Sequence, residues 1–153
     1  MGRVEPVRLE VARPRSLAAI SRTSEPGRLG ADIIGALDII WPELRRQGVA
    51  TGHNVVIYHG GPNAIDVGVE VVDGFVPSGE MKVVGTPGGE AAAAAHFGDY
   101  SELSAAYASL DEWRQRTGRR FAGVSWEVYG HWTDNRDELR TDVYFLLEPA
   151  RGS

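Results

Sequence analysis

The sequence Val-Val-Ile-Tyr-His-Gly at residues 55–60 has a counterpart in Trp-Glu-Val-Tyr-Gly-His at residues 126–131. Both stretches are apolar and end in a tyrosine followed by histidine and glycine in one order or the other. Each is preceded by a helical pattern and followed by an alternating strand that contains Asp-Val. The order strand, helix, strand, strand therefore occurs twice, over residues 17–72 and 91–147, and predicts two similar halves.

We expect these halves to form one α+β domain with a largely antiparallel sheet and with helices on one face. The expected halves cover about residues 4–75 and 80–148 of a single domain at 1–149, and residues 150–153 read as a disordered tail. Two related halves placed side by side leave a seam between them. That seam is where we expect a ligand cleft.

The first half contains a helix whose apolar residues recur at steps of three and four. These residues are Leu29, Ile33, Leu37, Ile40 and Leu44. Pro42 interrupts the pattern and predicts a kink or break near Trp41, and Gly48 is suited to end the helix. Strands are expected at residues 54–59 and 65–71. The second of these stretches alternates apolar and polar side chains, which is typical of a strand with one buried face.

The second half repeats this plan with less regular patterns. By analogy with the first half, residues 91–97 are expected to form a strand, although a run of alanines favours a helix. Asp99 and Glu102 are spaced for a capping box before a helix that ends at Gly118. The helix stripe consists of Leu103, Ala106, Tyr107, Leu110 and Trp113, and the last strands are expected at residues 121–131 and 139–147. The Gly- and Pro-rich link at residues 73–90 contains one short candidate strand at residues 81–84.

Composition excludes several classes of function. A net charge of −5 and a pI near 5.4 argue against a nucleic-acid surface. The absence of cysteine excludes disulfides and thiolate chemistry. The four histidines lack metal-ligand spacing, so we expect no metal and no cofactor. No apolar run is long enough for a membrane span and no signal-peptide pattern is visible, so we expect a cytoplasmic protein.

Aligning Tyr58 with Tyr129 places Val56 opposite Glu127 and divides each strand into two faces. We expect one apolar face to pack under the helices. This face contains Val55, Ile57, Trp126 and Val128. The opposite face is expected to line the groove, with Gly68 leaving room for a ligand and Tyr144 supplying a ring. Its members are Val56, Tyr58, Asp66, Gly68, Glu127, Tyr129, Asp142 and Tyr144.

Glu127 is the residue on which the functional prediction depends. A carboxylate in the middle of an apolar strand needs a partner or a raised pKa. It is interpreted as a ligand anchor or general base; an exposed strand residue and an ion pair with Arg140 are the alternatives. Trp41 and Trp132 are further candidates for the pocket, whereas Trp113 and Trp126 are expected in the core.

The arrangement resembles the GyrI-like superfamily, the effector-binding domains of multidrug-responsive bacterial transcription regulators. The resemblance rests on the order and spacing of four motifs. They are Tyr-His-Gly-Gly-Pro (58–62), Asp-Val-Gly-Val-Glu-Val (66–71), Trp-Glu-Val-Tyr-Gly (126–130) and Leu-Arg-Thr-Asp-Val-Tyr (139–144). It implies an aromatic cleft with a central glutamate that neutralises lipophilic cations. By motif position Glu127 matches that glutamate, with Tyr58, Tyr129 and Tyr144 as candidate wall residues, and the chain resembles a stand-alone member.

Three functions follow as hypotheses. The favoured one is binding of hydrophobic, cationic or planar small molecules such as drugs and other xenobiotics. The second, implied by a subset of the family, is hydrolysis of cyclopropane-bearing DNA-alkylating compounds, with Glu127 or a histidine as base and Tyr58 as hydrogen-bond donor. The third is binding of a protein partner such as gyrase through the acidic surface. The sequence does not specify the ligand or the oligomeric state.

Overall fold

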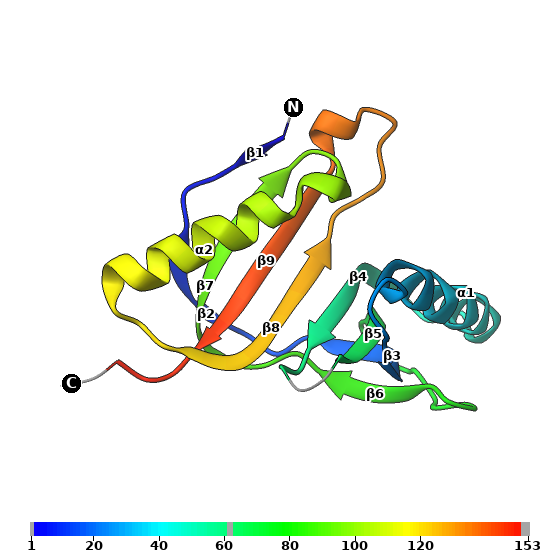
Figure 1. Ribbon diagram of the computed structural model, residues 1–153. Helices are drawn as coiled ribbons and strands as arrows, with labels where there is room; N and C mark the ends of the chain where they lie inside the picture. The colour runs from blue at the N-terminus through cyan, green and yellow to red at the C-terminus, as the bar shows by residue number, and fades with distance from the viewer. Residues whose placement is uncertain (1, 61–62, 151–153) are drawn as a thin grey trace. The chain divides into compact units, whose positions relative to one another are not determined.

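The computed structural model describes residues 2–60 and 63–150. The chain divides into two compact units. The first unit is Pro14–Thr86, and the second unit combines the segment before it with the segment after it. Each unit contains one α-helix and an antiparallel set of strands, which confirms the predicted α+β class (Figure 1). Residues 151–153 of the expected tail and residues 61–62 of the Gly-Gly-Pro turn lie outside the described residues.

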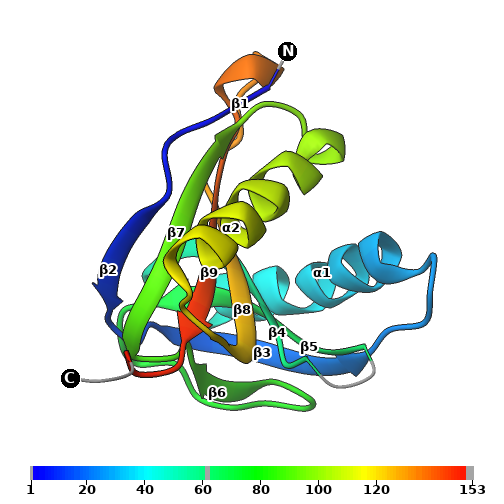
Figure 2. The ribbon, with the colours of Figure 1, turned by 60° about the vertical axis from the view of Figure 1, so that its left-hand side comes forward.

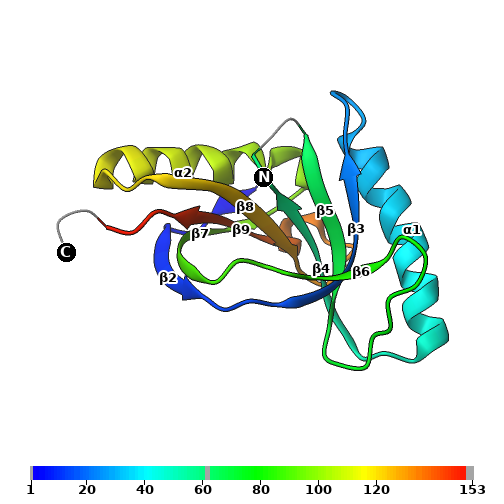
Figure 3. The same cartoon turned by 90° about the horizontal axis from the view of Figure 1, so that it is seen from below.

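Four strands and one helix make up the first unit. The strands are hydrogen-bonded in the order β4, β5, β3, β6, and every pair is antiparallel. Their bounds are β3 Ser16–Thr23, β4 Thr51–Tyr58, β5 Ala64–Val71 and β6 Lys82–Gly85. Helix α1, Leu29–Gln47, runs along β3 and β5 (Figure 3). The predicted helix and strands are therefore confirmed, including the short strand in the link.

Helix α1 continues through Pro42, so of the predicted kink or break near Trp41 the break is wrong, and the kink stays a prediction. A proline in a helix removes one N–H donor, and the carbonyl that loses this donor belongs to Asp38. Asp38 is exposed, so water can satisfy that carbonyl. The helix ends at Gly48, as predicted, in the left-handed conformation with φ of 68°. Ala36, Ile40 and Leu44 form its buried stripe.

The second unit is assembled from both ends of the chain. Its strands are β1 Arg3–Val4, β2 Arg8–Ala12, β7 Gly89–Phe97, β8 Phe121–Tyr129 and β9 Arg140–Leu147. Strand β9 lies between β7 and β8, and β1 and β2 both pair with the free edge of β7 (Figure 2). The sequence pattern assigns residues 4–12 to the first half, whereas their strands pair with β7.

Helix α2, Ser104–Thr117, covers one face of this sheet, and the single turns η1, Tyr100–Glu102, and η2, Arg136–Glu138, flank the strands. The predicted end at Gly118 is confirmed. Asp99 caps η1 by accepting from the Ser101 N–H, while Glu102 accepts from the Gly2 N–H at 2.7 Å.

In the core between α2 and its sheet, β7 contributes alanines and β9 contributes larger residues. The buried members are Ala92, Ala94, Ala106, Leu110, Val143, Phe145 and Leu147. The alanines on β7 let helix α2 approach closely, which explains why an alanine run forms a strand here in spite of its helical propensity. Tyr107 and Trp113 pack against this cluster, as expected for the helix stripe.

The predicted faces are half wrong. Val56, Tyr58, Glu127 and Tyr129 lie on the helix side of their sheets, whereas Asp66, Gly68, Asp142 and Tyr144 lie on the face away from the helices, as predicted. Directly paired residues on antiparallel strands point to the same face. Glu127 pairs with Val143, a member of the core under α2, so Glu127 faces the helix. Trp126 pairs with Tyr144 on the other face, where their rings stack at 5.1 Å and 4°. The prediction places Trp126 on the helix side because it is apolar, but both Trp126 and Glu127 are buried, so polarity does not distinguish the two faces.

Among the described residues, no helix is long and apolar enough to cross a membrane.

Candidate ligand-binding site

The carboxylate of Glu127 is the centre of the candidate site. It lies on β8 and is only 4% exposed. Burial of a carboxylate is costly unless donors compensate for lost water. The Tyr107 hydroxyl on α2 donates to Oε2, and the Tyr129 hydroxyl on β8 donates to Oε1. Each oxygen of the carboxylate therefore has a phenol donor, one from the helix and one from the same strand.

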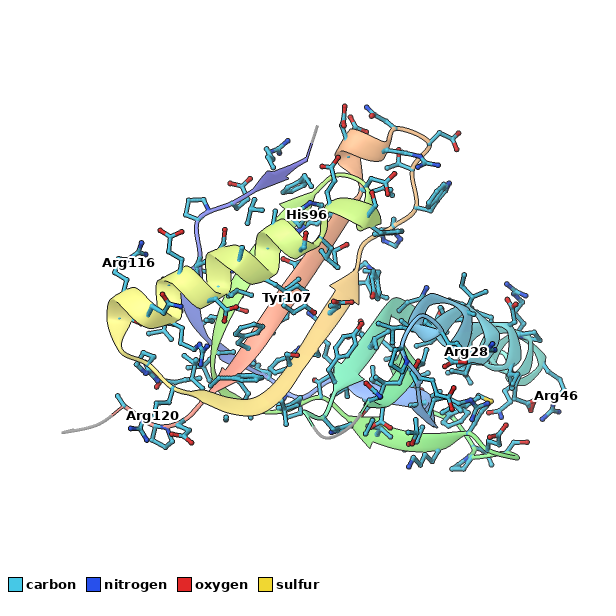
Figure 4. The ribbon with its side chains drawn as sticks, in the orientation of Figure 1. Arg28, Arg46, His96, Tyr107, Arg116 and Arg120 are labelled. Atoms are coloured by element: carbon cyan, nitrogen blue, oxygen red, sulfur yellow. The ribbon has the colours of Figure 1, made fainter. Side chains whose placement is uncertain are left out.

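Secondary structure brings these three side chains together. Residues 127 and 129 share a face because side chains alternate along a strand. Tyr107 lies beside Ala106 on the stripe of α2 that faces the sheet, and its ring centroid is 5.8 Å from that of Phe145 (Figure 4). The ring of Tyr107 thus contributes to the apolar core, while its hydroxyl extends to the glutamate.

A third tyrosine extends the aromatic surface towards solvent. The ring of Tyr100 meets that of Tyr129 edge to face, at 5.7 Å and 86°. Tyr100 is 40% exposed, and partial burial together with the Asp99 charge raises the pKa of its phenol. We refer to Glu127, Tyr100, Tyr107 and Tyr129 as the Glu127 site. It combines a buried carboxylate with two half-buried rings and one exposed ring.

A row of polar side chains crosses the sheet beside this site. Tyr129, Thr141 and His96 are direct neighbours on β8, β9 and β7, and they lie on the same face as Glu127. His96 and Thr141 are both 0% exposed, and neither the His96 ring nitrogens nor the Thr141 hydroxyl form a hydrogen bond within the described part of the chain. Burial lowers the pKa of His96, and the negative charge of Glu102 acts in the opposite direction.

This lowered pKa predicts an acid-sensitive fold. Unfolded histidine takes up a proton near pH 6.5, whereas His96 in the folded protein stays neutral to lower pH. The unfolded state therefore binds more protons in that window, and the free energy of unfolding decreases as the pH falls below about 6.5. Urea unfolding between about pH 5 and 7.5 measures this slope. In His96→Gln the slope is expected to be shallower; an unchanged slope would assign the acid sensitivity to other groups.

The structure places the predicted site residues on both faces and in both units. Glu127 and Tyr129 are brought together as predicted. Tyr144 lies on the opposite face of its sheet from Glu127, because it pairs with Trp126. Tyr58 lies on β4 in the first unit. It shares a face with Asn54, whose Oδ1 accepts from Trp41 Nε1 at 3.0 Å, so Tyr58 is on the α1 side of its sheet.

Gly68 is expected from the sequence to leave room for a ligand, and the structure corrects this expectation. A Cβ at position 68 would lie 2.9 Å from the Cβ of Leu17 and 3.1 Å from that of Ala19. The space beside Gly68 is therefore occupied by the neighbouring strand β3. Close packing of two strands, rather than access for a ligand, accounts for this glycine.

The two tryptophans proposed for the pocket have different surroundings. Trp41 is half-buried on α1 and is held by its hydrogen bond to Asn54. Arg45 lies over its ring at 5.8 Å. Trp132 follows β8 and is 66% exposed. Their roles as ligand contacts stay predictions.

Sequence reasoning misses Tyr107 and Tyr100. It assigns Tyr107 to the apolar stripe, which is correct for the ring but omits the hydroxyl. The sequence does contain a signal for the contact between Tyr107 and Glu127. A tyrosine on a buried helix face and a glutamate on a buried strand each need a polar partner, so they can be expected to pair. Within residues 2–60 and 63–150, no three His, Asp or Glu side chains converge to hold a metal ion.

Comparison with solved structures shows the same fold. The C-terminal domain of EcmrR superimposes with a TM-score of 0.80 at 18% identity, covering 94% of this chain and 98% of that domain. A hydrolase encoded by lin2189 of Listeria innocua gives 0.66 at 11% identity, covering 94% and 92%. SAV2435 bound to tetraphenylphosphonium gives 0.59 at 11% identity, covering 94% of each chain.

No curated protein matches the chain in sequence. The model of one protein family does match it, over residues 32–148, which include α2, most of α1 and every residue of the Glu127 site. The resemblance expected from the four motifs is thereby confirmed. The chain belongs to the family of GyrI-like small molecule binding domains.

Proposed function

We propose that this protein binds hydrophobic small molecules that are cationic or planar, with Glu127 as the anchor for positive charge. The observation that carries the proposal is a buried carboxylate held by two phenols and extended by a third tyrosine ring. Tyr58, Tyr144, Trp41 and Trp132 remain predicted ligand contacts.

The chemistry of the Glu127 site suits a lipophilic cation. A carboxylate has about four lone-pair sites, so it can accept hydrogen bonds from phenols and still attract a positive group nearby. Tyrosine faces attract cations, and this attraction strengthens when water is excluded. Because Glu127 is buried, its charge is screened less by salt than that of a surface carboxylate. A ligand with a diffuse charge and large apolar area would use both features.

Tetraphenylphosphonium is the probe of choice. It is a lipophilic cation without hydrogen-bond donors, so its binding would report charge and ring contacts alone. SAV2435, which has the same fold, has been solved bound to it.

Glu127→Gln is expected to weaken tetraphenylphosphonium binding by about tenfold or more, because one close charge interaction is worth roughly 1.4 kcal/mol or more in a desolvated site. Glutamine keeps the size and the acceptor oxygen but removes the charge. Titration followed by tryptophan fluorescence or calorimetry measures the affinity. Glu112→Gln is the matched control, since Glu112 is exposed on α2 and its substitution removes the same charge from the same unit.

Equal affinities of wild type and Glu127→Gln for tetraphenylphosphonium would show that Glu127 is not the anchor. A loss of affinity in both variants would attribute binding to net charge rather than to the Glu127 site. The fluorescence and circular dichroism of each free variant establish that the fold is kept.

Hydrolysis of a cyclopropane-bearing alkylator is the second candidate. The observation in its favour is the contact of two phenols with Glu127. The carboxylate of Glu127 could act as a general base, and the phenols could donate hydrogen bonds to the reacting group. A ring-opened product whose mass has increased by one water, formed by wild type and lost in Glu127→Gln, would establish this activity. Binding of a protein partner through the acidic surface is the third prediction from the sequence.

A further inference from the structure

Strand β2 forms an outer edge of the second unit. It pairs with β7 along one side, and no described strand pairs with its other side (Figure 2). The backbone N–H and C=O groups of that free side can therefore form a ladder with another extended segment. Proline does not continue such a ladder, so Pro6 and Pro14 limit the available edge to residues 7–13.

The free edge presents large apolar side chains to water. Leu9 is 49% exposed and Val11 is 73% exposed. Leu9 pairs with Ala92 of the core under α2, so Leu9 and Val11 both lie on the α2 face by strand alternation. Val7 packs against the same core cluster and begins the row. An apolar row along a free edge is a template for pairing with a further strand.

The other face of β2 carries one positive and one negative side chain. Arg8 and Glu10 pair with alanines of β7 on the face away from α2, and their side chains are 38% and 35% exposed. Arg8 Nε donates to Glu10 Oε2 at 2.8 Å, and its Nη2 lies 3.4 Å from Asp142 Oδ1. Both charges are partly open to solvent, so each can also interact with an opposite charge on another chain.

The order of these side chains makes the edge complementary to itself. Residues 7–11 read Val-Arg-Leu-Glu-Val, which alternates apolar residues with one positive and one negative charge. If two copies lie antiparallel with Leu9 opposite the partner's Leu9, then Arg8 lies opposite the partner's Glu10. Val7 likewise lies opposite the partner's Val11. Every apolar residue then meets an apolar residue, and every charge meets its opposite.

The charges also select this register over its neighbours. Moving the centre of the pairing from Leu9 to Arg8 would put two arginines directly opposite each other. Moving it to Glu10 would put two glutamates opposite each other, and like charges in this position are destabilising. Directly opposite Cβ atoms are about 4.5–5.5 Å apart, whereas residues two apart on one strand are separated by about 6.8 Å. Arg8 would therefore lie closer to the partner's Glu10 than to its own.

We propose that β2 is a dimerisation edge, which pairs antiparallel with β2 of a second copy of this chain about a two-fold axis at Leu9. The sheet of the second unit then continues from one copy into the other. The paired stretch is short, so the interface belongs to the small, transient class, with Kd on the order of 10–100 µM. This proposal does not depend on ligand binding at the Glu127 site.

Sedimentation velocity of the intact protein, from about 5 to 500 µM, tests the association. The mass is expected to rise from monomer to dimer over this range. Leu9→Asp places two carboxylates opposite each other and removes apolar contact, so it should weaken the dimer by about tenfold or more. Val83→Asp is the matched control, because Val83 is 55% exposed on β6, the edge strand of the first unit. It should leave Kd within about twofold of wild type.

A mixing experiment tests the charge complementarity and the register. Glu10→Arg and Arg8→Glu each put like charges opposite each other, so each variant alone should dimerise at least about fivefold more weakly than wild type. Mixed in equal amounts, the two variants again place opposite charges face to face. The mixed dimer is expected to form with Kd within about threefold of wild type. Loss of the fold could not be repaired by mixing, and circular dichroism of each variant verifies it.

Three results would overturn the proposal. A protein that stays monomeric up to about 500 µM has no self-complementary edge of useful strength, and β2 would then be left to a segment of another protein. A dimer that Leu9→Asp does not weaken would have its contact elsewhere, at β6 if Val83→Asp abolishes it. A mixture of Glu10→Arg and Arg8→Glu that associates no better than either variant alone would contradict the pairing centred on Leu9.

Discussion

Replacing Tyr107 and Tyr129 together by phenylalanine is expected to lower the free energy of unfolding by about 4 kcal/mol, because each hydrogen bond to a buried charged group contributes roughly 1.5–3 kcal/mol. Both rings remain, so little apolar contact is lost. Removal of the hydroxyls takes away one phenol donor from each oxygen of Glu127. Urea unfolding followed by tryptophan fluorescence measures the change.

Two further variants test the physical reason. Tyr100→Phe removes a hydroxyl from the ring that meets Tyr129 edge to face, and its effect is expected to stay within about 0.5 kcal/mol, as for a partly exposed surface group. Adding Glu127→Leu to the double phenylalanine variant removes the buried carboxylate and should restore about half of the lost stability. If the triple variant is no more stable than the double one, the cost lies in packing and not in the carboxylate.

Gly68→Val is expected to destabilise the first unit by about 3 kcal/mol, the upper part of the usual range for overpacking a core. Even the first carbon of the new side chain would lie 2.9 Å from Leu17 Cβ and 3.1 Å from the Ala18 carbonyl oxygen. Contacts between carbon atoms are favourable only near 3.5–4.0 Å, so β3 and β5 would have to separate. Thermal unfolding or urea unfolding of the variant measures the loss.

Gly85→Val is the matched control for this substitution. Gly85 also lies in a strand, but a Cβ there would have no neighbour nearer than 3.9 Å. Its replacement is expected to change stability by no more than about 0.5 kcal/mol. If Gly68 instead left room for a ligand, Gly68→Val would keep the stability of the wild type and lose affinity for tetraphenylphosphonium.

Several features of the site can be derived from sequence because they depend on local chemistry. A glutamate between Trp126 and Val128 must be either solvated or provided with donors, and this requirement is enough to single out Glu127. Tyr129 follows two residues later, so strand alternation alone places it beside the carboxylate. The repeat of strand, helix, strand, strand predicts the order of the main elements and, together with the four motifs, the family.

Other features depend on contacts between segments that are distant in the chain. Tyr107 and Glu127 meet because α2 packs on β9 and its neighbours, and no local pattern encodes which hydroxyl reaches which carboxylate. Strands β1 and β2 pair with β7, which comes much later in the sequence, because that strand has a free edge. His96 and Thr141 become neighbours through the same kind of pairing.

The sequence by itself determined the fold class, the repeated elements, the family and the need of Glu127 for a partner, because periodicity and the cost of burying charge are properties of short segments. Only the tertiary structure decided which face of each sheet the helix covers. Alternation divides a strand into two faces, but it does not show which face the helix covers. Trp126 on one face and Glu127 on the other are both buried, so burial does not distinguish the faces either. The helix resolves that ambiguity, since its contact with Val143 and Phe145 places Tyr107 above Glu127 and leaves Tyr144 on the opposite face.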